Sequence, residues 1–209
     1  MKIIDLTHFV EEEMTVYCEE ESANIKPLYK VEECGFNVLT VELSTHTGTH
    51  IDSARHIFKD GATIDDFDLN KFIGDAYIID CTNMQEITLE TILKHKKQIE
   101  GVDYLILKTG WEDKWYTEAY LEGYPILSDE ACEFLSNIET LSGIGLDCIS
   151  VDSRGKDVKN HRILLSKGKM LIENLCNVKD LNEKCKIIIA PLKVRNADGA
   201  PTRVYALEE

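Results

Sequence analysis

The sequence has few prolines, few histidines and no long apolar run. Its 209 residues include only four prolines and six histidines. No apolar stretch approaches the ~20 residues that a helix needs to cross a bilayer, and acidic residues follow the start of the chain too soon for a signal peptide. From these absences we expect a cytoplasmic protein without a membrane anchor.

Cysteine pairs and positive charge are also lacking. The seven cysteines are scattered and odd in number, and none forms a Cys-x-x-Cys pair, so we expect reduced thiols and not a disulfide framework. Lys and Arg number 23 against 38 Asp and Glu, which gives a net charge of -15. Such a charge repels phosphate backbones and anionic membrane surfaces. The expected partner is therefore a small-molecule substrate, with no nucleic acid and no membrane.

The length and the apolar pattern predict a single mixed α/β domain over residues 1–209. Composition does not shift abruptly at any point, and 44% hydrophobic residues suffice for a full core. Apolar or β-branched runs bounded by turn residues predict strands at 2–6, 36–45, 76–81, 104–108, 145–150 and 186–190. Helical spacing predicts helices at 89–99 after a Thr88 cap and 129–137 after a Ser128 cap, and shorter ones at 117–122 and 161–167.

Half of the histidines fall in one short segment. Residues 45–56 read Thr-His-Thr-Gly-Thr-His-Ile-Asp-Ser-Ala-Arg-His and contain His46, His50, Asp52 and His56. Imidazole and carboxylate are ligands that zinc and similar divalent ions prefer, and a hydrolytic metal site usually adds a proton-transferring group. A single such histidine is better explained as a hydrogen-bonded residue at a strand edge. The four residues together predict metal-dependent chemistry.

The backbone of this segment must bend sharply to form a metal site. Positions four apart in a strand are separated by roughly 13 Å, whereas each ligand atom must approach an ion to about 2.0–2.2 Å. Gly48 permits a bend, and the surrounding threonines disfavour a helix. We therefore expect a strand, with Leu39, Val41 and Leu43 on its buried face, that ends in a tight loop.

The other three histidines lie far from this segment. His8 and His95 are expected in structural or surface roles. His161 precedes Glu173, which stands in the apolar stretch 170–175. A carboxylate in apolar surroundings is costly unless it is paired or bound to a metal, so Glu173 is either an ion-pair partner or a second contribution to the metal site.

These motifs resemble the metal-dependent cyclase family, whose best-known enzymatic members are bacterial kynurenine formamidases, also called arylformamidases. The family pattern His-x-Gly-Thr-His-x-Asp-x-x-x-His fits residues 46–56 at every fixed position. Ile-Glu-Asn-Leu at 172–175, preceded by His161, resembles the downstream ligand block, and residues 4–7 and 14–17 resemble the amino-terminal region. The resemblance covers most of the chain and implies a swivelling β/β/α fold.

The resemblance also implies roles for individual residues. It implies two divalent metal ions, Zn²⁺ or else Mn²⁺, and a homodimer or homotetramer. One ion would be bound by His46, His50 and Asp52, and a second by Asp52, Glu173 and His161, with Asp52 and Glu173 bridging the two. His56 would be the catalytic acid and base, a role that suits an unliganded imidazole near neutral pH.

The activity implied is hydrolysis of a small amide, with the aryl formamide N-formylkynurenine of tryptophan catabolism as the leading substrate. Water activated by the metal would attack the carbonyl, and His56 would protonate the leaving amine. The chain departs from the family at Ser53-Ala54-Arg55, where a proline is lost, and at Cys18-Glu19-Glu20. Tyr17 is a candidate for stacking on the substrate, or else for packing. Arg55 is a candidate for binding a substrate carboxylate, or else a surface residue.

Two alternatives remain open. The first is a cyclic amide or lactone hydrolase that binds one ion, which metal stoichiometry would distinguish. The second is a non-catalytic protein that binds a metal or a small ligand through the same residues. Such a protein would hold the metal tightly and hydrolyse no formamide, lactam or lactone.

Overall fold

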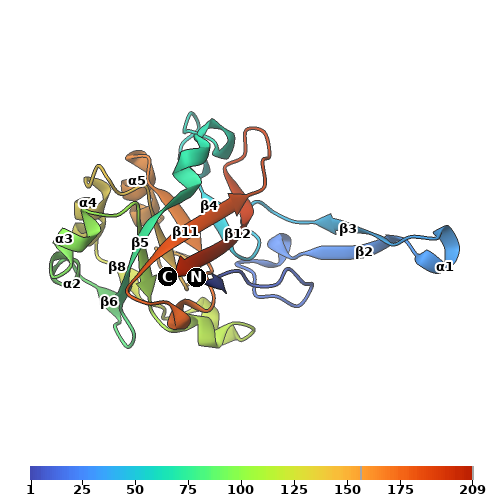
Figure 1. Ribbon diagram of the computed structural model, residues 1–209, viewed down its shortest axis with the longest axis horizontal. Coiled ribbons are helices and arrows are strands. Elements are labelled where there is room, and N and C mark those ends of the chain that lie inside the picture. Colours follow the sequence, from blue (N-terminus) through green and yellow to red (C-terminus); the bar gives the residue numbers. More distant parts are fainter. Residues whose placement is uncertain (156, 209) are drawn as a thin grey trace.

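A curved sheet, a group of helices and a long projecting arm make up the computed structural model, which describes residues 1–155 and 157–208 (Figure 1). The sheet has eight strands in the order β1-β12-β11-β5-β7-β9-β10-β4. Their bounds are β1 Lys2–Asp5, β4 His50–Asp52, β5 Ile73–Asp80, β7 Tyr104–Lys108, β9 Gly143–Leu146, β10 Met170–Glu173, β11 Lys184–Pro191 and β12 Gly199–Glu208.

Strand β12 closes this sheet on itself. It pairs along its length with β11 and β1, and its first residues pair with β4. Strands β5, β7, β9 and β10 run parallel to one another, and the remaining pairings are antiparallel. Inside the closed sheet lies an apolar core that includes Ile51, Ile106, Ile172, Ile187 and Val204. Each of these side chains is fully buried, so burial of apolar area favours closure.

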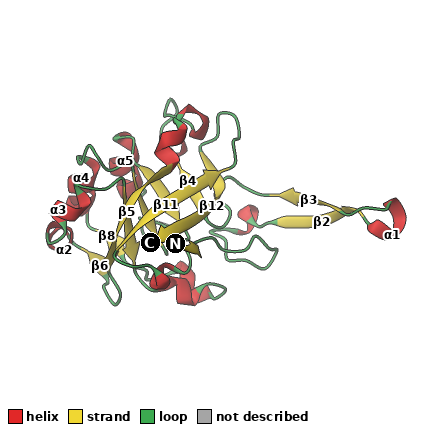
Figure 2. Ribbon diagram, viewed as in Figure 1, coloured by secondary structure: helices red, strands yellow, loops and turns green. Residues whose placement is uncertain are grey.

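The helices cover the outer face of the parallel strands (Figure 2). They are α2 Leu89–Leu93, α3 Lys96–Ile99, α4 Asp129–Ser136 and α5 Lys159–Ser166, and short strands β6 Glu86–Ile87 and β8 Ile126–Leu127 pair beside them. Single 3₁₀ turns occupy Glu19–Glu21, Ala54–His56, Ile64–Asp66, Leu69–Phe72, Trp111–Lys114, Glu118–Leu121 and Val178–Asp180. A second apolar core fills the space between helices and sheet.

An arm extends away from the body between residues 24 and 42 (Figure 1). It consists of β2 Asn24–Tyr29, the short helix α1 Val31–Cys34 and β3 Val38–Glu42, and the two strands pair with each other in a separate two-stranded sheet. The prediction that Leu39 and Val41 lie on a buried face of the strand at 36–45 is wrong, because Leu39 is 58% and Val41 50% exposed. Period-two alternation identifies residues that share a face and not what covers that face.

Most of the other predicted elements are confirmed. Strands at 104–108 and 186–190 lie within observed strands, and the strand at 76–81 matches β5 except for Cys81. The strand expected at 145–150 is wrong beyond Leu146, where β9 ends. The caps at Thr88 and Ser128 accept hydrogen bonds from Thr91 and Ala131. The helix expected at 89–99 is instead two short helices, α2 and α3, and the one at 117–122 is a 3₁₀ turn. All seven cysteines are free. In the part of the chain described, every helix is too short or too polar to span a bilayer.

Candidate metal centre

The histidine segment forms the expected tight loop followed by a very short strand. Gly48 adopts the left-handed conformation with φ of 67°, and a Cβ there would lie 2.6 Å from the methyl carbon of Met14. Strand β4 then places His50 and Asp52 on one face and buries Ile51 on the other. The bend predicted at Gly48 is confirmed.

Strand pairing brings the second histidine region to the first. Strand β4 lies between β10 and β12, and in the β10–β4 register Glu173 is directly opposite His50. Side chains of directly opposite residues lie on the same face of a sheet. The carboxylate that stood in an apolar stretch of sequence therefore points at the same site as His50. Helix α5 supplies His161 from the side.

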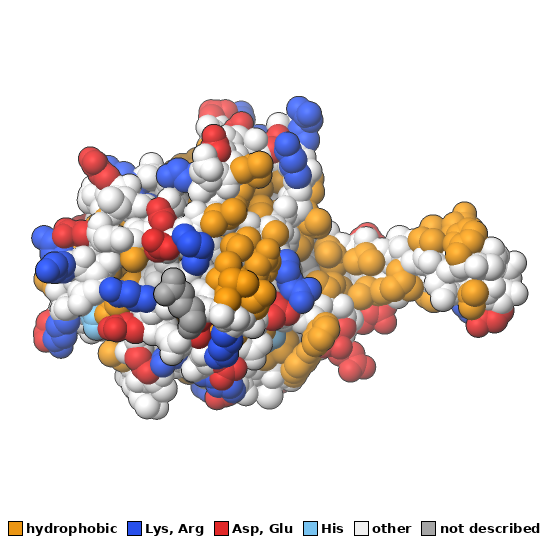
Figure 3. Space-filling model, viewed as in Figure 1, with side chains coloured by type: hydrophobic (Ala, Val, Ile, Leu, Met, Phe, Trp, Pro, Cys, Tyr) orange, Lys and Arg blue, Asp and Glu red, His pale blue; other side chains and the backbone are white. Residues whose placement is uncertain are grey.

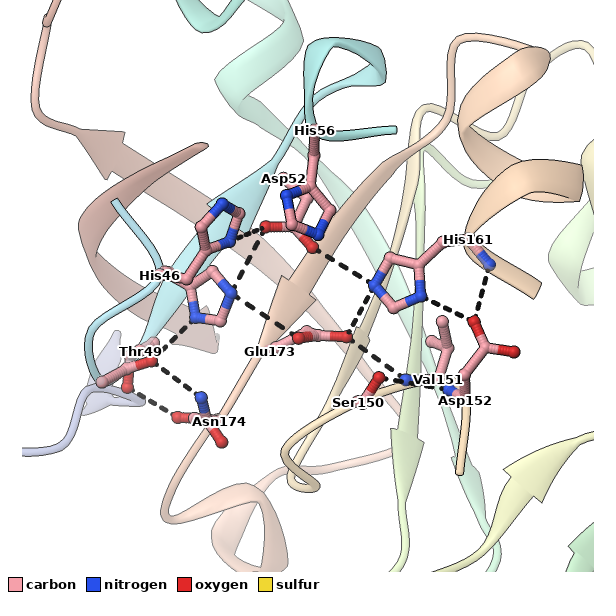
Figure 4. Close-up of polar contacts among 12 residues, drawn as sticks. His46, Thr49, Asp52, His56, Ser150, Val151, Asp152, His161, Glu173 and Asn174 are labelled. Carbon is pink, nitrogen blue, oxygen red and sulfur yellow. Dashed lines mark hydrogen bonds and ion pairs between the residues drawn. The ribbon is translucent and has the colours of Figure 1, made fainter. Parts of the chain in front are cut away.

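Five side chains converge at short distances (Figure 4). Oδ1 of Asp52 lies 2.8 Å from Nδ1 of His46 and 3.3 Å from Nε2 of His50. Its Oδ2 lies 3.6 Å from Nε2 of His161. The Glu173 carboxylate likewise approaches Nε2 of His50 at 3.5 Å and Nε2 of His161 at 3.5 Å. Each carboxylate thus presents one oxygen to each side of the site.

This donor set fits a divalent cation. Both carboxylate oxygens of Asp52 are buried and accept no hydrogen bond from the described residues, although ring nitrogens face them. A buried ionised oxygen without a partner is costly. Ligand atoms of His50, Asp52 and Glu173 lie within 4.8 Å of one another, as do those of His46, Asp52 and His56. Nitrogen and oxygen donors gathered in this way suit zinc, manganese and similar ions.

The carboxylates make the site strongly attractive to positive charge. Burial by itself lowers the pKa of His46, but the Asp52 and Asp198 carboxylates outweigh burial and raise the pKa to about 10. The pKa of His50 and that of His161 are also raised, because nearby carboxylates outweigh burial. The same histidines hold the pKa of Asp52 well below its usual value despite burial. Protons and a divalent ion would therefore compete for this site.

Two carboxylates that the sequence analysis missed orient the histidines. Asp198 Oδ2 lies 2.9 Å from Nε2 of His46 and 3.5 Å from Nδ1 of His56. Asp152 Oδ2 lies 2.7 Å from Nδ1 of His161 and also accepts the backbone N–H of that residue. Such contacts fix the ring orientation of a ligand histidine. Asp198 is 152 positions from His46 in the sequence, whereas Asp152 is nine positions from His161. Neither aspartate belongs to a motif that the sequence analysis identified.

Gly199 allows His46 to pack against the backbone beside Asp198. A Cβ at Gly199 would lie 2.8 Å from Cε1 of His46 and 2.9 Å from the carbonyl oxygen of Ile51. Both distances are too short for any larger residue without movement of the imidazole or the strand. The position of the His46 ring therefore depends on the glycine that opens β12.

His56 occupies a more open place than the other site histidines. It ends the 3₁₀ turn Ala54–His56, its side chain is 31% exposed, and its ring centroid lies 4.2 Å from that of His46. It lines the same cavity as the converging residues. An accessible imidazole beside a buried donor set is suited to exchanging a proton with a bound molecule.

The site forms the floor of a cavity of about 200 Å³. Val16, Tyr17 and Val158 also line it, and Tyr17 is partly exposed to solvent. Arg55 does not line the cavity. Its guanidinium donates to the carbonyl of Lys59 at the surface, which is the surface alternative considered above.

Comparison with known proteins places these features in context. The sequence profile of the family described as putative cyclase matches residues 4–153. A kynurenine formamidase from Bacillus cereus is 33% identical over 175 residues, which are 83% of this chain and 81% of that protein. Several solved structures share the fold. One is a potential metal-dependent hydrolase with cyclase activity, with a TM-score of 0.82, 28% identity and coverage of 100% and 99% of the two chains. Another is isatin hydrolase A from Labrenzia aggregata bound to benzyl benzoate, with a TM-score of 0.87, 25% identity and coverage of 98% and 93%.

Fold and site together define a class, the metal-dependent hydrolases whose donors line a closed, strand-rich sheet. Within that class the chain belongs to the cyclase family, since the family profile matches more than half of it and the Bacillus cereus relative extends over most of it. The resemblance expected from the histidine motif and the mixed α/β fold are thereby confirmed.

Proposed function

We propose that this enzyme hydrolyses a small amide, and that its substrate is an aryl formamide such as N-formylkynurenine. One observation carries the proposal: a buried histidine and carboxylate donor set lies at the floor of a cavity in a chain related to a kynurenine formamidase. Membership of a hydrolase family also argues against a protein that only binds its ligand.

Two metal positions are proposed from the way the carboxylates divide. His46 and His50 face Oδ1 of Asp52, whereas His161 faces Oδ2. Glu173 repeats this division, with one oxygen toward His50 and the other toward His161. We assign one ion to His46, His50 and Asp52, and a second to Asp52, Glu173 and His161, with Zn²⁺ first and Mn²⁺ second. Bound ions would polarise the amide carbonyl and make water a stronger nucleophile near neutral pH.

The remaining chemistry belongs to the side chains around the cavity. His56 is proposed to donate a proton to the leaving nitrogen, and Asp198 keeps the imidazole turned toward the site. An arylamine is a better leaving group than an alkylamine because its nitrogen is less basic. Val16, Tyr17 and Val158 provide an apolar wall against which an aryl ring can pack.

Removal and return of metal test this function. Dialysis against a chelator is expected to abolish turnover of N-formylkynurenine and formanilide, and added Zn²⁺ or Mn²⁺ is expected to restore it. The side chains of the site cannot activate water and polarise the carbonyl as a metal ion does. Elemental analysis is expected to give two ions per chain. One ion with lactam or lactone turnover would support the cyclic-substrate alternative, and tight metal without any hydrolysis would support a binding protein.

We also propose that the enzyme is a homodimer or homotetramer, assembled through the arm, and that it resides in the cytoplasm, where free cysteines persist. An isolated two-stranded ribbon is marginally stable in water. The arm also carries many exposed apolar side chains along its length and at its tip, as Figure 3 shows. They include Leu28, Tyr29, Phe36, Leu39 and Val41. A second copy of the chain would cover this surface.

Charged residues on the arm are expected to prevent this assembly. Leu39 and Val41 share a face of the arm, and their replacement with lysine (Leu39→Lys with Val41→Lys) places two charges where apolar burial is proposed. Sedimentation should show a 23.8 kDa monomer for the variant and a dimer or tetramer for the parent. Glu86→Lys on the body makes the same change in net charge and should leave assembly intact. A monomeric parent would refute the proposal.

A further inference from the structure

A single Lys or Arg side chain stands among the described residues that line the cavity. Arg154 is the only Lys or Arg in that lining, which otherwise contains neutral residues, histidines and the carboxylates of Glu21, Asp52, Asp152 and Glu173. It also lines the two grooves that adjoin the mouth of the cavity beside Tyr17. Any molecule that enters along this side passes the guanidinium group.

The structure holds Arg154 in place through Tyr17. Nη2 of Arg154 donates to the carbonyl oxygen of Tyr17 at 2.5 Å, and its Cζ lies 5.2 Å from the centroid of the Tyr17 ring. The backbone N–H of Gly155 donates to the Tyr17 hydroxyl at 3.2 Å. The same loop carries Asp152, which orients His161. Arg154 is therefore linked by two residues of backbone to the floor of the cavity.

The guanidinium keeps most of its binding capacity for another molecule. It has five N–H groups, and the structure gives it one hydrogen bond, to Tyr17. Among the described residues, no carboxylate oxygen lies within 4.0 Å of the Arg154 guanidinium, so the group forms no ion pair there. Glu13, Glu19 and Glu118 line one adjoining groove with it, so its surroundings are acidic. A chain of net charge -15 repels anionic substrates, and Arg154 offsets that repulsion at the entrance.

We propose that Arg154 binds the carboxylate of the substrate, so that the preferred substrates are aryl amides that carry an acidic group. The inference rests on the proposed amide hydrolysis and narrows its substrate class. The amide lies at the metal centre, the aryl ring packs against Val16 and Tyr17, and the carboxylate accepts hydrogen bonds from the guanidinium, which matches its geometry. Arg154 thus takes the role that the sequence suggested for Arg55.

Pairs of substrates with and without a carboxylate test this inference. N-formylkynurenine is compared with its α-carboxamide, which keeps the α-amino group, and 2-formamidobenzoate is compared with formanilide. The carboxylate is far from the formamide in the first pair and close to it in the second. Arg154→Gln is expected to raise KM for the better acidic substrate by about 10- to 100-fold, as for loss of a charged hydrogen bond. Its KM for the partner that lacks the carboxylate should change less than about threefold. Arg154→Lys should recover part of the preference, because it keeps the charge and loses the paired geometry.

Each other outcome has a distinct meaning. If Arg154→Gln raises KM equally for the substrates with and without a carboxylate, Arg154 only holds Tyr17 in place. That result overturns the inference and leaves the proposed function in place. Arg55→Gln serves as the control, and a loss of acid preference in that variant as large as in Arg154→Gln would also overturn it. If the parent enzyme hydrolyses none of the four compounds, the proposed function fails, and the inference fails with it.

Discussion

Asp52→Asn should leave a folded protein that binds almost no metal and hydrolyses an aryl formamide about a thousandfold more slowly than the parent enzyme. The substitution keeps the shape of the side chain and removes the charge that both sets of histidines face. Metal ions contribute several kcal/mol to such reactions, and each 1.36 kcal/mol corresponds to a tenfold change in rate. Because Asp52 lies between the two proposed positions, its loss should empty both.

Elemental analysis, kcat and circular dichroism together check this result. Asp60→Asn removes an exposed carboxylate a few residues further along and should keep metal and turnover. An Asp52→Asn protein that retains its metal and at least a tenth of parent activity would show that Asp52 is not a ligand. Loss of one ion with the other retained would restrict Asp52 to a single position.

His56→Ala is expected to keep the metal and lose about 10²- to 10⁴-fold in kcat, the usual contribution of a positioned acid or base. Its imidazole is partly exposed in the cavity and lies beside the Asp198 carboxylate. The loss of kcat should be smaller for a substrate whose amine can leave without first being protonated. We therefore expect 4-nitroformanilide to be affected much less than formanilide.

The substrate comparison separates proton donation from metal binding. His56 is also close enough to His46 and Asp52 to be a ligand. If His56→Ala loses metal and slows both formanilides equally, His56 is a ligand and not the acid. His95→Ala, which removes a histidine that hydrogen-bonds Tyr77, should match the parent in metal content and kcat.

Local signals in the sequence predicted much of the fold. Residues 104–107 of β7 form an uninterrupted apolar run, and both the strand and the burial of these residues follow from that pattern. Ser128 caps α4 as its sequence context indicated. The bend at Gly48 followed from the distance constraint on two ligands of one ion. In each case the neighbouring residues alone determine the structure.

Long-range pairing accounts for what the sequence could not predict. Asp198 is separated from His46 by 152 positions, and only the pairing of β12 with β4 brings them together. Leu39 and Val41 have the alternation of a half-buried strand, yet the strand runs out along the arm. A residue's partners across a sheet depend on register, which no local pattern specifies.

The position of β4 between β10 and β12 links metal loading to completion of folding. Each of the two pairings joins segments more than a hundred residues apart, and contacts of that separation form slowly. His50 and Glu173 meet only once β4 and β10 are paired. An ion that binds the native chain and not the unfolded one adds to stability by mass action. Metal uptake should thus report how many molecules have reached the native state, and scarcity of the ion should raise the fraction of chains that are not fully folded.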